Sequence, residues 1–340
     1  MHLILLKFLL AQAYMLRISR QNEEGKDMFE EVYSKIEDYC NYRIGTGYSG
    51  FSAKKGIKKF LDYCLVNFPD ETTITKNMVD SWLNHRAHMS SNTQAKSVTH
   101  IRNFSNYLNF IGIHSYIPDD DYNVKCIGYI PYVFSDYELK AFFDSVDNYT
   151  ATKRTEKYHP DLVLPVIFRF MYCCGMRPGE PLRLLRNDVN LKTGDVYIRK
   201  TKCNKDRHII ISEDMRQLCS VYNSFSSPNR TYFIEYRGTA CSIDWMGIMF
   251  HKCWDNSGLV KHGNPRPYDL RHAFASRNII KWIDEGKDVM SLMPFLSEYM
   301  GHSSLQHTLY YIHMIPERLR NTSNIDWNSF SRIYGKGGEY

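Results

Sequence analysis

The sequence predicts a mainly helical protein with one small antiparallel β-hairpin, an α+β fold divided into two domains. Apolar residues recur at helical spacing over most of the chain. A two-residue alternation marks the hairpin around 195–211. A segment with prolines, an aspartate run and no periodicity interrupts the pattern at 113–131. At 340 residues the chain is long enough for two domains that each bury a core.

Residues 1–24 are predicted to form an amphipathic helix ahead of the first domain. Their apolar stretch ends in a signal-like Ala-Gln-Ala, but Lys7 interrupts the apolar run instead of preceding it. Lys7, Gln12 and Arg17 also break the run too often for it to cross a bilayer. We therefore expect neither export nor a membrane span.

Residues 25–115 are predicted to form a helical bundle. One of its helices places apolar residues on a single stripe, namely Ile57, Phe60, Leu61, Cys64 and Phe68. Lysines occupy the flanks and the back of the same helix, at Lys54, Lys55, Lys58 and Lys59. This basic edge is equally compatible with a solvated face and with contacts to phosphate groups.

Capping signals place two more helices in this bundle. Thr75 is a candidate cap for a helix that contains Trp82, and Ser91 with Gln94 forms a capping box. The helix that follows Ser91 is expected to stop at Gly112. Residues 116–131 then form a linker between the domains.

The second domain is expected over 132–322, followed by a tail over 323–340. Ser135 and Glu138 form a capping box at its first helix. A strongly apolar helix follows and ends at Gly175. The hairpin comes next, with Val196 and Ile198 on one strand and residues 209–211 on the other.

Charge and cysteine content narrow the function classes. Lys and Arg total 43 against 37 Asp and Glu, which gives a net charge of +6 and suits a polyanionic partner without requiring one. The nine cysteines show no C-x-x-C spacing. We therefore expect free thiols in a reducing compartment, with neither disulfides nor a zinc site.

Chemically capable side chains concentrate in four clusters of the second domain: CGMRPGEPLRLL, RKTKCNKDR, RPYDLRHAF and YMGHSSLQHTLYYIH. Each cluster has a simple structural explanation. Arg177 could bond the last carbonyls of the preceding helix. Lys202 could be a solvated charge beside a turn, and Arg271 could pair with Asp269. Taken singly, no cluster identifies a function.

Taken together and in this order, the clusters resemble the tyrosine recombinase (phage integrase) family over about residues 130–320. The residues that match the boxes of that family are Gly175, Arg177, Glu180, Leu184, Lys202, Arg271, His302 and Tyr311. The resemblance implies a two-domain clamp on DNA, made of an N-terminal helical core-binding domain and a C-terminal catalytic domain.

The resemblance also implies a strand-exchange mechanism without metal, ATP or another cofactor. Tyr311 would attack a phosphodiester and form a 3′-phosphotyrosyl bond that keeps the bond energy for rejoining. Arg177 and Arg271 would grip the non-bridging oxygens. His302 would donate a hydrogen bond to the phosphate, and Lys202 would protonate the leaving 5′ oxygen.

Helical phase does not decide which tyrosine reacts. At 100° per residue, Leu305, Leu309 and Ile312 share the core face, so Tyr310 and Tyr311 both point away from it on opposite sides. The family spacing, nine residues beyond the histidine of the third box, selects Tyr311 as the nucleophile and leaves Tyr310 as a packing residue.

Three residues have supporting roles in this interpretation. Glu180 would orient a basic residue of the site. Tyr268 stands where the family has a histidine, so it would keep only the hydrogen-bonding part of that role, and the phosphate or His302 would take the phenol proton. His272 is expected to be a structural partner.

The resemblance implies double-stranded DNA as the partner. The free protein would be a monomer or dimer, and a homotetramer would carry out recombination. The C-terminal tail either docks on a neighbouring subunit or is frayed. Expected backbone contacts are Lys54, Lys55, Lys58, Lys59, Lys96 and Arg102. The function predicted is a cytoplasmic, nucleoid-associated recombinase of a mobile element.

Two alternatives use the same fold. A type IB topoisomerase-like enzyme would relax DNA as a monomer, but the separate helical domain and its linker favour the recombinase. A non-catalytic DNA-binding protein would need only basic helices. The complete set of two arginines, lysine, histidine and tyrosine argues against that second alternative.

Overall fold

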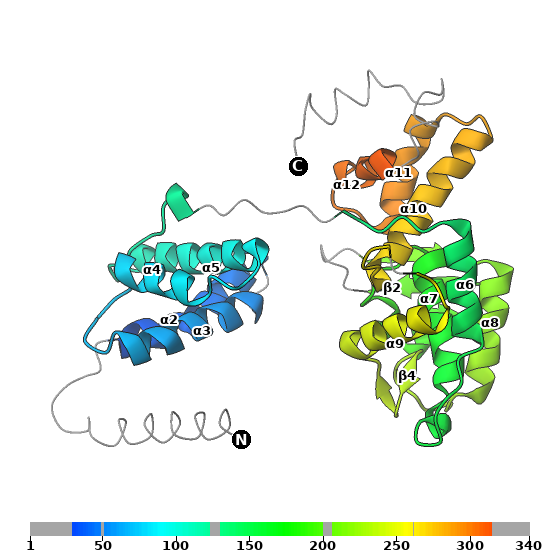
Figure 1. Ribbon diagram of the computed structural model, residues 1–340, viewed down its shortest axis with the longest axis horizontal. Coiled ribbons are helices and arrows are strands. Elements are labelled where there is room, and N and C mark those ends of the chain that lie inside the picture. Colours follow the sequence, from blue (N-terminus) through cyan, green and yellow to red (C-terminus); the bar gives the residue numbers. More distant parts are fainter. Residues whose placement is uncertain (1–28, 49–50, 123–129, 200–205, 261, 315–340) are drawn as a thin grey trace. The chain divides into compact units, whose positions relative to one another are not determined.

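The chain divides into two compact units, with the division in the sequence between residues 128 and 129. The computed structural model describes residues 29–48, 51–122, 130–199, 206–260 and 262–314, shown in colour in Figure 1. The predicted helix at 1–24 and the predicted tail at 323–340 lie outside the described residues. None of the described helices combines the length and the apolarity that a membrane crossing requires.

The first unit is a helical bundle, as predicted. Its elements are α2 (Glu30–Gly45), α3 (Phe51–Asn67), α4 (Lys76–His85), α5 (Ser91–Phe110) and the short 3₁₀ helix η1 (Asp120–Tyr122). Helix α3 contacts α2, α4 and α5, and the predicted stripe forms its inner face. Ile57, Phe60, Leu61 and Cys64 are buried. At Gly56 a Cβ atom would come within 2.2 Å of the His100 ring, so glycine allows α3 to approach α5 closely.

The helix ends of the first unit follow the sequence signals in part. Thr75 caps α4 and its hydroxyl accepts the Met78 N–H. The Ser91/Gln94 capping box is wrong, because the cap is Ser90 and the Gln94 amide instead donates to the Met89 carbonyl. Gly112, at φ 87°, follows the end of α5 as predicted.

The segment after α5 packs on the first unit. The Tyr116 N–H donates to the Ile74 carbonyl at 2.9 Å, and the Tyr122 hydroxyl bonds the Asp80 carboxylate. Both rings lie against the bundle core. The unit therefore extends past residue 115, where we expected the linker to begin.

The second unit is mainly helical with small antiparallel sheets, which confirms the predicted fold class. Its helices are α6 (Asp136–Asp147), α7 (Pro160–Cys173), α8 (Glu213–Phe225), α9 (Ile243–Asn256), α10 (Pro267–Asp284), α11 (Val289–Met300) and α12 (Gln306–Leu309). Its 3₁₀ helices are η2 (Glu156–Tyr158), η3 (Pro181–Arg183), η4 (Arg186–Asp188) and η5 (Tyr310–Met314). Its strands are β1 (Val189–Asn190), β2 (Asp195–Ile198), β3 (Arg207–Ile210), β4 (Glu235–Tyr236) and β5 (Thr239–Ala240).

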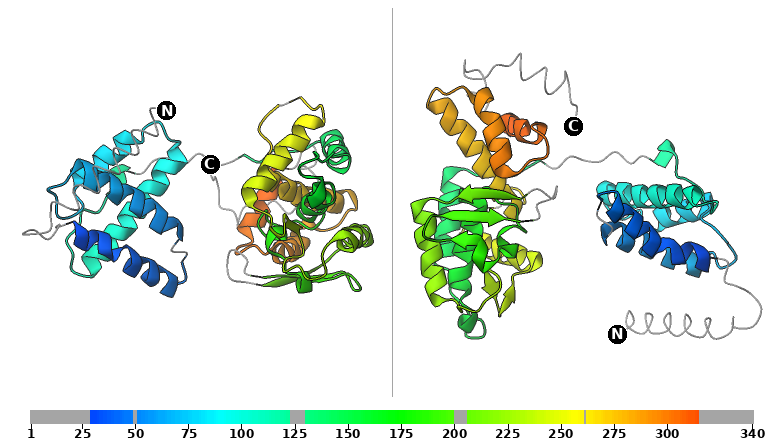
Figure 2. Two further views of the ribbon diagram at one scale, coloured as in Figure 1. Left: turned by 90° about the horizontal axis from the view of Figure 1, so that it is seen from below. Right: turned by 180° about the vertical axis from the view of Figure 1, so that it is seen from behind.

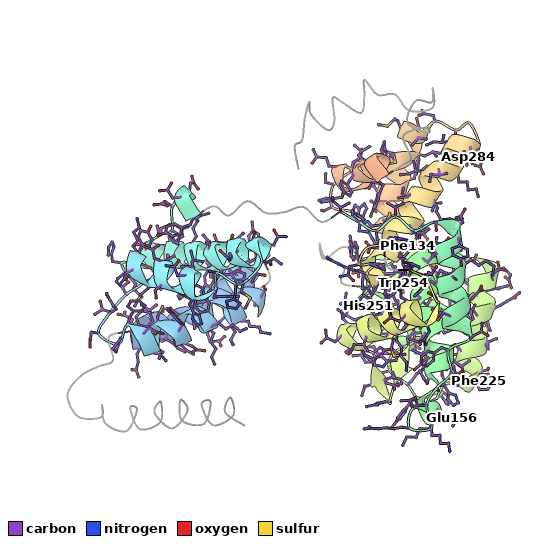
Figure 3. The ribbon with its side chains drawn as sticks, viewed as in Figure 1. Phe134, Glu156, Phe225, His251, Trp254 and Asp284 are labelled. Atoms are coloured by element: carbon purple, nitrogen blue, oxygen red, sulfur yellow. The ribbon has the colours of Figure 1, made fainter. Side chains whose placement is uncertain are left out.

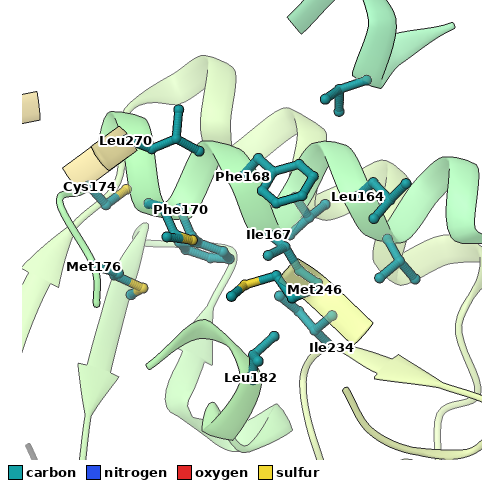
Figure 4. Close-up of a cluster of buried hydrophobic side chains, with 14 of the residues drawn as sticks. Leu164, Ile167, Phe168, Phe170, Cys174, Met176, Leu182, Ile234, Met246 and Leu270 are labelled. Atoms are coloured by element: carbon teal, nitrogen blue, oxygen red, sulfur yellow. The ribbon is translucent and has the colours of Figure 1, made fainter. Parts of the chain in front are cut away.

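Helix α7 runs through the core of the second unit, as its apolar sequence predicts. Its own side chains Ile167 and Phe170 are buried, and Met246 of α9 belongs to the same buried cluster (Figure 4). On α9, the Trp254 ring packs against Phe134 with ring centroids 5.7 Å apart (Figure 3). The Ser135/Glu138 capping box opens α6 as predicted.

The predicted hairpin consists of β2 and β3, paired antiparallel from Asp195–Ile210 to Ile198–Arg207. The short strand β1 adds a third strand that the sequence pattern did not reveal. Figure 2 shows this sheet from behind, and β3 contacts the orange helix α11. Within the turn that joins β2 to β3, residues 200–205, among them Lys202, lie outside the described residues.

Candidate active site

Three of the four sequence clusters meet where the ends of α7 and α11 approach α10. Arg177 follows α7, Arg271 lies in the second turn of α10, and His302 follows α11. Tyr311 lies in η5, which contacts α10. The fourth cluster contributes Arg207 at the start of β3, while its Lys202 is not described. The fold thus gathers residues that are up to 134 positions apart, from 177 to 311.

Arg271 is fully buried and bound to the ends of two helices. Its Nη1 donates to the Gly175 carbonyl at 2.5 Å, and its Nη2 donates to the Met300 carbonyl at 2.8 Å. The Nε atom is buried and has no hydrogen-bond partner in the described part of the chain. This guanidinium therefore sits in a fixed position, and its Nε donor is unused among the described residues.

The position of Gly175 requires a glycine. Its φ is 60°, and a Cβ atom there would lie 2.5 Å from the Phe274 ring of α10. The chain can therefore turn sharply after α7 and present the Gly175 carbonyl to Arg271.

Arg177 lies closer to the surface than Arg271, with 17% of its side chain exposed. Its Nη1 donates to Glu180 Oε1 at 2.9 Å, and its Nη2 donates to the Gly301 carbonyl at 2.5 Å. The alternative that Arg177 bonds the last carbonyls of α7 does not match these contacts. Its guanidinium instead bridges the turn after α7 to the turn after α11.

Glu180 is buried and ionised. Burial by itself would raise the pKa of this carboxyl. The hydrogen bonds and charge of Arg207, together with the Arg177 N–H, outweigh burial and lower the pKa to about 2. The carboxylate therefore holds its charge throughout the neutral range and contacts two cations of the site.

His302 is neutral and is an acceptor toward Arg271. Burial first, and then the charges of Arg271 and Arg177, lower the pKa of His302 to about 3. Its Nε2 lies 2.8 Å from Nη2 of Arg271, and because a guanidinium can only donate, Nε2 accepts. Its Nδ1 then carries the proton and donates to Thr308 Oγ1 at 2.6 Å. Donation from His302 to a DNA phosphate stays a prediction.

Tyr311 is buried, with 2% of its surface exposed. Burial raises its pKa to about 12, although the charges of Arg271 and Arg177 oppose that rise. Its ring centroid lies 6.1 Å from that of His302 and 5.4 Å from that of His272. The phenol therefore lies beside the rings of His302 and His272, within reach of the charges of Arg271 and Arg177, and needs a proton acceptor before it can attack.

The predicted orientation of Tyr311 is wrong. We expected it to point away from the core, but it is buried together with Leu309 and Ile312. The α-helical geometry lasts only from Gln306 to Leu309, and η5 then continues at about 120° per residue, which changes the phase. Tyr310 is half-buried, with its ring 6.3 Å from that of Tyr311.

Tyr268 lies at the rim of this site. It is 36% exposed, and its ring centroid is 4.9 Å from that of His272. The His272 ring in turn lies between those of Tyr268 and Tyr311, and burial followed by the charge of Arg271 lowers the pKa of His272 to about 4. Tyr268 is therefore close to the site but does not contact His302 or Arg177 through any described hydrogen bond.

The predicted DNA-contact residues lie on α3 and α5 of the first unit. Lys55, Lys58, Lys59 and Lys96 are exposed. Lys54 forms an ion pair with Glu37, and Arg102 donates to the Pro118 and Asp119 carbonyls. The last two side chains are therefore engaged within the unit.

Residues 138–318, more than half of the chain, match the model of the phage integrase family. The chain belongs to the phage integrase family. It is 30% identical over 190 residues to an integrase/recombinase of Sinorhizobium fredii, y4rE, a match that covers 54% of this chain and 59% of the relative. It is 21% identical over 316 residues to the tyrosine recombinase XerC of Listeria monocytogenes, covering 88% of this chain and 97% of that protein.

Solved structures share the integrase fold. XerH recombinase in a pre-cleavage complex with its difH substrate gives a TM-score of 0.61 at 18% identity, over 86% of this chain and 95% of that chain. A lambda integrase dimer bound to a core site gives 0.58 at 15% identity, over 80% and 95%. The family consists of tyrosine recombinases, which are DNA strand-exchange enzymes.

Sequence reasoning missed two residues of this integrase site, Arg207 and Thr308. Arg207 shares the inner face of β3 with Ile209, and a charge at an inward position of a strand signals a buried partner. Thr308 lies three residues after Leu305 on the apolar side of its helix, and it is fully buried. A polar residue on a core face is the sequence signal that was available in both cases.

Proposed function

We propose that this integrase is a site-specific recombinase of a mobile element, which cleaves and rejoins DNA through a 3′-phosphotyrosyl bond at Tyr311. The observation that carries the proposal is the gathering of Tyr311, His302 and Arg271: the Tyr311 and His302 ring centroids are 6.1 Å apart, and Nε2 of His302 lies 2.8 Å from Nη2 of Arg271. Two fixed guanidinium groups suit the extra negative charge that develops on a phosphodiester under attack.

Proton transfer follows from the contacts of His302. A phosphate oxygen that takes over the Nη2 donor of Arg271 would free the Nε2 lone pair of His302. Nε2 would then accept the phenol proton while the phenolic oxygen forms its bond to phosphorus. The 5′ oxygen leaves and takes a proton from Lys202, which the family resemblance supplies for that role.

Tyr311 must become accessible for this reaction. It is 2% exposed, and Arg271 is occupied by two carbonyls and His302. Since a DNA phosphate needs both the phenol and these donors, η5 has to shift when DNA binds. The substrate would thereby trigger assembly of the reactive arrangement.

A nicked half-site that traps the covalent intermediate tests the proposal. We expect a protein–DNA adduct with the unaltered chain and with Tyr310→Phe, and none with Tyr311→Phe. Tyr310→Phe is the matched control, since the two tyrosines are adjacent. Binding without any adduct would favour the non-catalytic DNA-binding protein. Relaxation of plasmids that lack the target site would favour the topoisomerase-like enzyme.

The proton acceptor is tested by pH–rate profiles of single-turnover cleavage. Tyr268→Phe is expected to change the rate modestly, because Tyr268 lies at the rim, and to leave the profile unshifted. A profile that shifts in Tyr268→Phe and again in Tyr268→His would place the transferred proton on residue 268. A rate identical to that of the unaltered chain would remove Tyr268 from the site.

The proposed partner is double-stranded DNA, with four protomers in the recombining complex. A lambda integrase tetramer bound to a Holliday junction is among the structures with this fold, at a TM-score of 0.57. The exposed lysines of α3 and α5 would contact the DNA backbone, which sets affinity and salt dependence. Light scattering of the protein with and without a Holliday junction measures the stoichiometry.

A further inference from the structure

Arg207 is a buried cation that the proposed chemistry does not use. It begins β3 and is 8% exposed, on the same inner face as Ile209, because alternate residues of a strand face the core. A buried charge is retained when it is paired and fully hydrogen-bonded. The contacts of Arg207 therefore indicate its role.

Arg207 joins three parts of the second unit. Its Nη1 and Nη2 donate to the two carboxylate oxygens of Glu180 at 3.0 and 2.7 Å. Its Nε donates to the Tyr299 carbonyl in the last turn of α11 at 2.9 Å. This two-pronged contact fixes both the position and the plane of the carboxylate.

The same carboxylate holds Arg177. Oε1 of Glu180 accepts from Nη1 of Arg177, and Oε2 accepts from the Arg177 N–H, both at 2.9 Å. Each oxygen of Glu180 thus has one bond to Arg177 and one to Arg207. Four donors use the ordinary accepting capacity of a carboxylate, so Glu180 has little freedom to rotate.

Gly301 lies between the two guanidinium groups. Its carbonyl accepts from Arg177, and a Cβ atom on it would lie 3.0 Å from Nη1 of Arg207. Its φ of 65° also favours glycine. The turn that delivers His302 to the site is therefore shaped around Arg207 on one side and Arg177 on the other.

We propose that Arg207 is a positioning residue for strand cleavage, which fixes Glu180 and, through Glu180, the guanidinium of Arg177, and which fastens the β2–β3 hairpin to the site. The inference rests on the proposed function, because it gives Arg177 the work of gripping the DNA phosphate. It adds a residue that acts through others and touches no DNA.

Single-turnover cleavage of the nicked half-site at saturating DNA, from pH 4 to 9, tests the inference with Arg207→Met. The cleavage rate is expected to fall about 10- to 100-fold, since small displacements of a clamping group cost that much. DNA affinity is expected to stay within about twofold.

The pH profile gives a signature that simple loss of stability would not. Without Arg207 the burial of Glu180 is opposed by fewer positive charges, so its pKa rises well above that of the unaltered chain. The ionised carboxylate is the form that holds Arg177. The variant should therefore lose rate as the pH falls, whereas the unaltered chain, with Glu180 at a pKa of about 2, should show no such loss from this group.

Three further variants separate positioning from folding. Arg207→Lys keeps the positive charge but lacks the two-pronged guanidinium contact. Its cleavage rate should therefore lie between those of Arg207→Met and the unaltered chain. Arg207→Met combined with Glu180→Gln should lose the acid dependence. Arg230→Met is the matched control, since Arg230 is 7% exposed and donates to the Phe233 and Ser227 carbonyls away from this network. It should keep the normal rate and profile at saturating DNA.

The outcomes distinguish this inference from the proposed function. Cleavage by folded Arg207→Met at the normal rate and profile overturns the inference and leaves the function intact. If Arg207→Met does not fold, Arg207→Lys decides, and a rate equal to that of the unaltered chain overturns the inference. If the unaltered chain forms no adduct, the function fails. In that case NMR titration of the Glu180 carboxyl tests the positioning role by itself. An equal titration midpoint in the unaltered chain and in Arg207→Lys would overturn that role.

Discussion

The two units differ in what they bury. Among the described residues of the first unit, the buried polar side chains are neutral serines, namely Ser97, Ser105 and Ser115. The second unit buries charged side chains, namely Glu180, Asp188, Arg207, Arg230, Asp269 and Arg271. The first unit is thus an apolar core that presents its charges outward. The second holds buried charges that are each paired or hydrogen-bonded, such as Glu180 with Arg207.

This difference has an energetic consequence. Truncation in an apolar core costs free energy roughly in proportion to the cavity it leaves. A buried ionic network responds differently, because removing one partner leaves another charge uncompensated, at about 3–5 kcal/mol. We therefore expect truncation of a buried charged side chain in the second unit to lower the unfolding free energy more than truncation of a buried polar side chain in the first unit.

Arg271→Met should produce the largest effect. It removes the buried cation that bonds the Gly175 and Met300 carbonyls and His302. Half-site cleavage should fall by about 10²–10³ or more, and unfolding free energy should fall by about 2–4 kcal/mol because two buried carbonyls lose their donor. Single-turnover assays and urea unfolding measure the two quantities.

Arg43→Met is the comparison for that variant in the first unit. Arg43 donates to the Tyr39 hydroxyl and lies over the Tyr39 and Tyr48 rings. A loss of about 1 kcal/mol or less is expected there. Equal losses for Arg271→Met and Arg43→Met would remove the proposed distinction between the units.

Acid should weaken the second unit over the pH range in which imidazoles titrate. The folded pKa values of His302 and His272 are lowered to about 3 and about 4, mainly by burial. Unfolded imidazoles bind protons near pH 6.5 while these two do not, so stability is complete above about pH 6.5 and falls as the pH is lowered. Each imidazole should cost about 2 kcal/mol between pH 6.5 and 5.

Hydrogen exchange of α10, α11 and η5, corrected for the intrinsic pH dependence of exchange, measures this loss. His302→Gln should reduce it. His100→Gln is the control, since His100 also has a lowered pKa from burial but lies in the first unit. It should leave exchange in the second unit unchanged. A fall in protection that is the same in His302→Gln as in the unaltered chain would contradict the linkage.

Thr308→Val tests a single hydroxyl of the network. It keeps the shape of the side chain but leaves the Nδ1–H of His302 without its acceptor. Cleavage should slow by about 3- to 10-fold and unfolding free energy should fall by about 1–2 kcal/mol. Thr308→Ser should restore most of the rate.

A serine pair of the first unit is the matched control. Ser105 accepts from the Ser115 hydroxyl at 3.1 Å inside the bundle. Ser105→Ala should lower stability by about 1 kcal/mol and leave cleavage at saturating DNA unchanged. If Thr308→Val behaves like Ser105→Ala, Thr308 has no role in orienting His302.

The sequence predicted the elements whose signals are local. The stripe of α3, the Thr75 cap and the hairpin alternation each depend on neighbouring residues, and the structure confirms them. The Ser91/Gln94 box failed because the Gln94 side chain found a carbonyl acceptor in the preceding turn, which a capping pattern does not reveal.

The site was predictable in its members more than in its geometry. Arg177, Arg271, His302 and Tyr311 were located by box spacing. The acceptor role of His302 toward Arg271 depends on a contact across 31 positions. The orientation of Tyr311 was missed because an α-helical phase was assumed where η5 is a 3₁₀ helix. Arg207 escaped notice because its partners, Glu180 and Tyr299, are distant in sequence.

Neutralising surface lysines of the first unit should have the smallest effect on chemistry. Lys55, Lys58 and Lys59 are exposed on α3, where they would contact DNA phosphates. Changing all three to glutamine should leave cleavage at saturating DNA within about twofold. The slope of log affinity against log salt should become shallower by about 0.9 for each phosphate contact that is lost.

Lys140→Gln in the second unit is the control. Lys140 is paired with Asp144, so this variant should leave the salt slope unchanged. An unchanged salt slope in the triple variant would instead identify these lysines as a solvated face, and the DNA contacts of the first unit would have to lie on another surface.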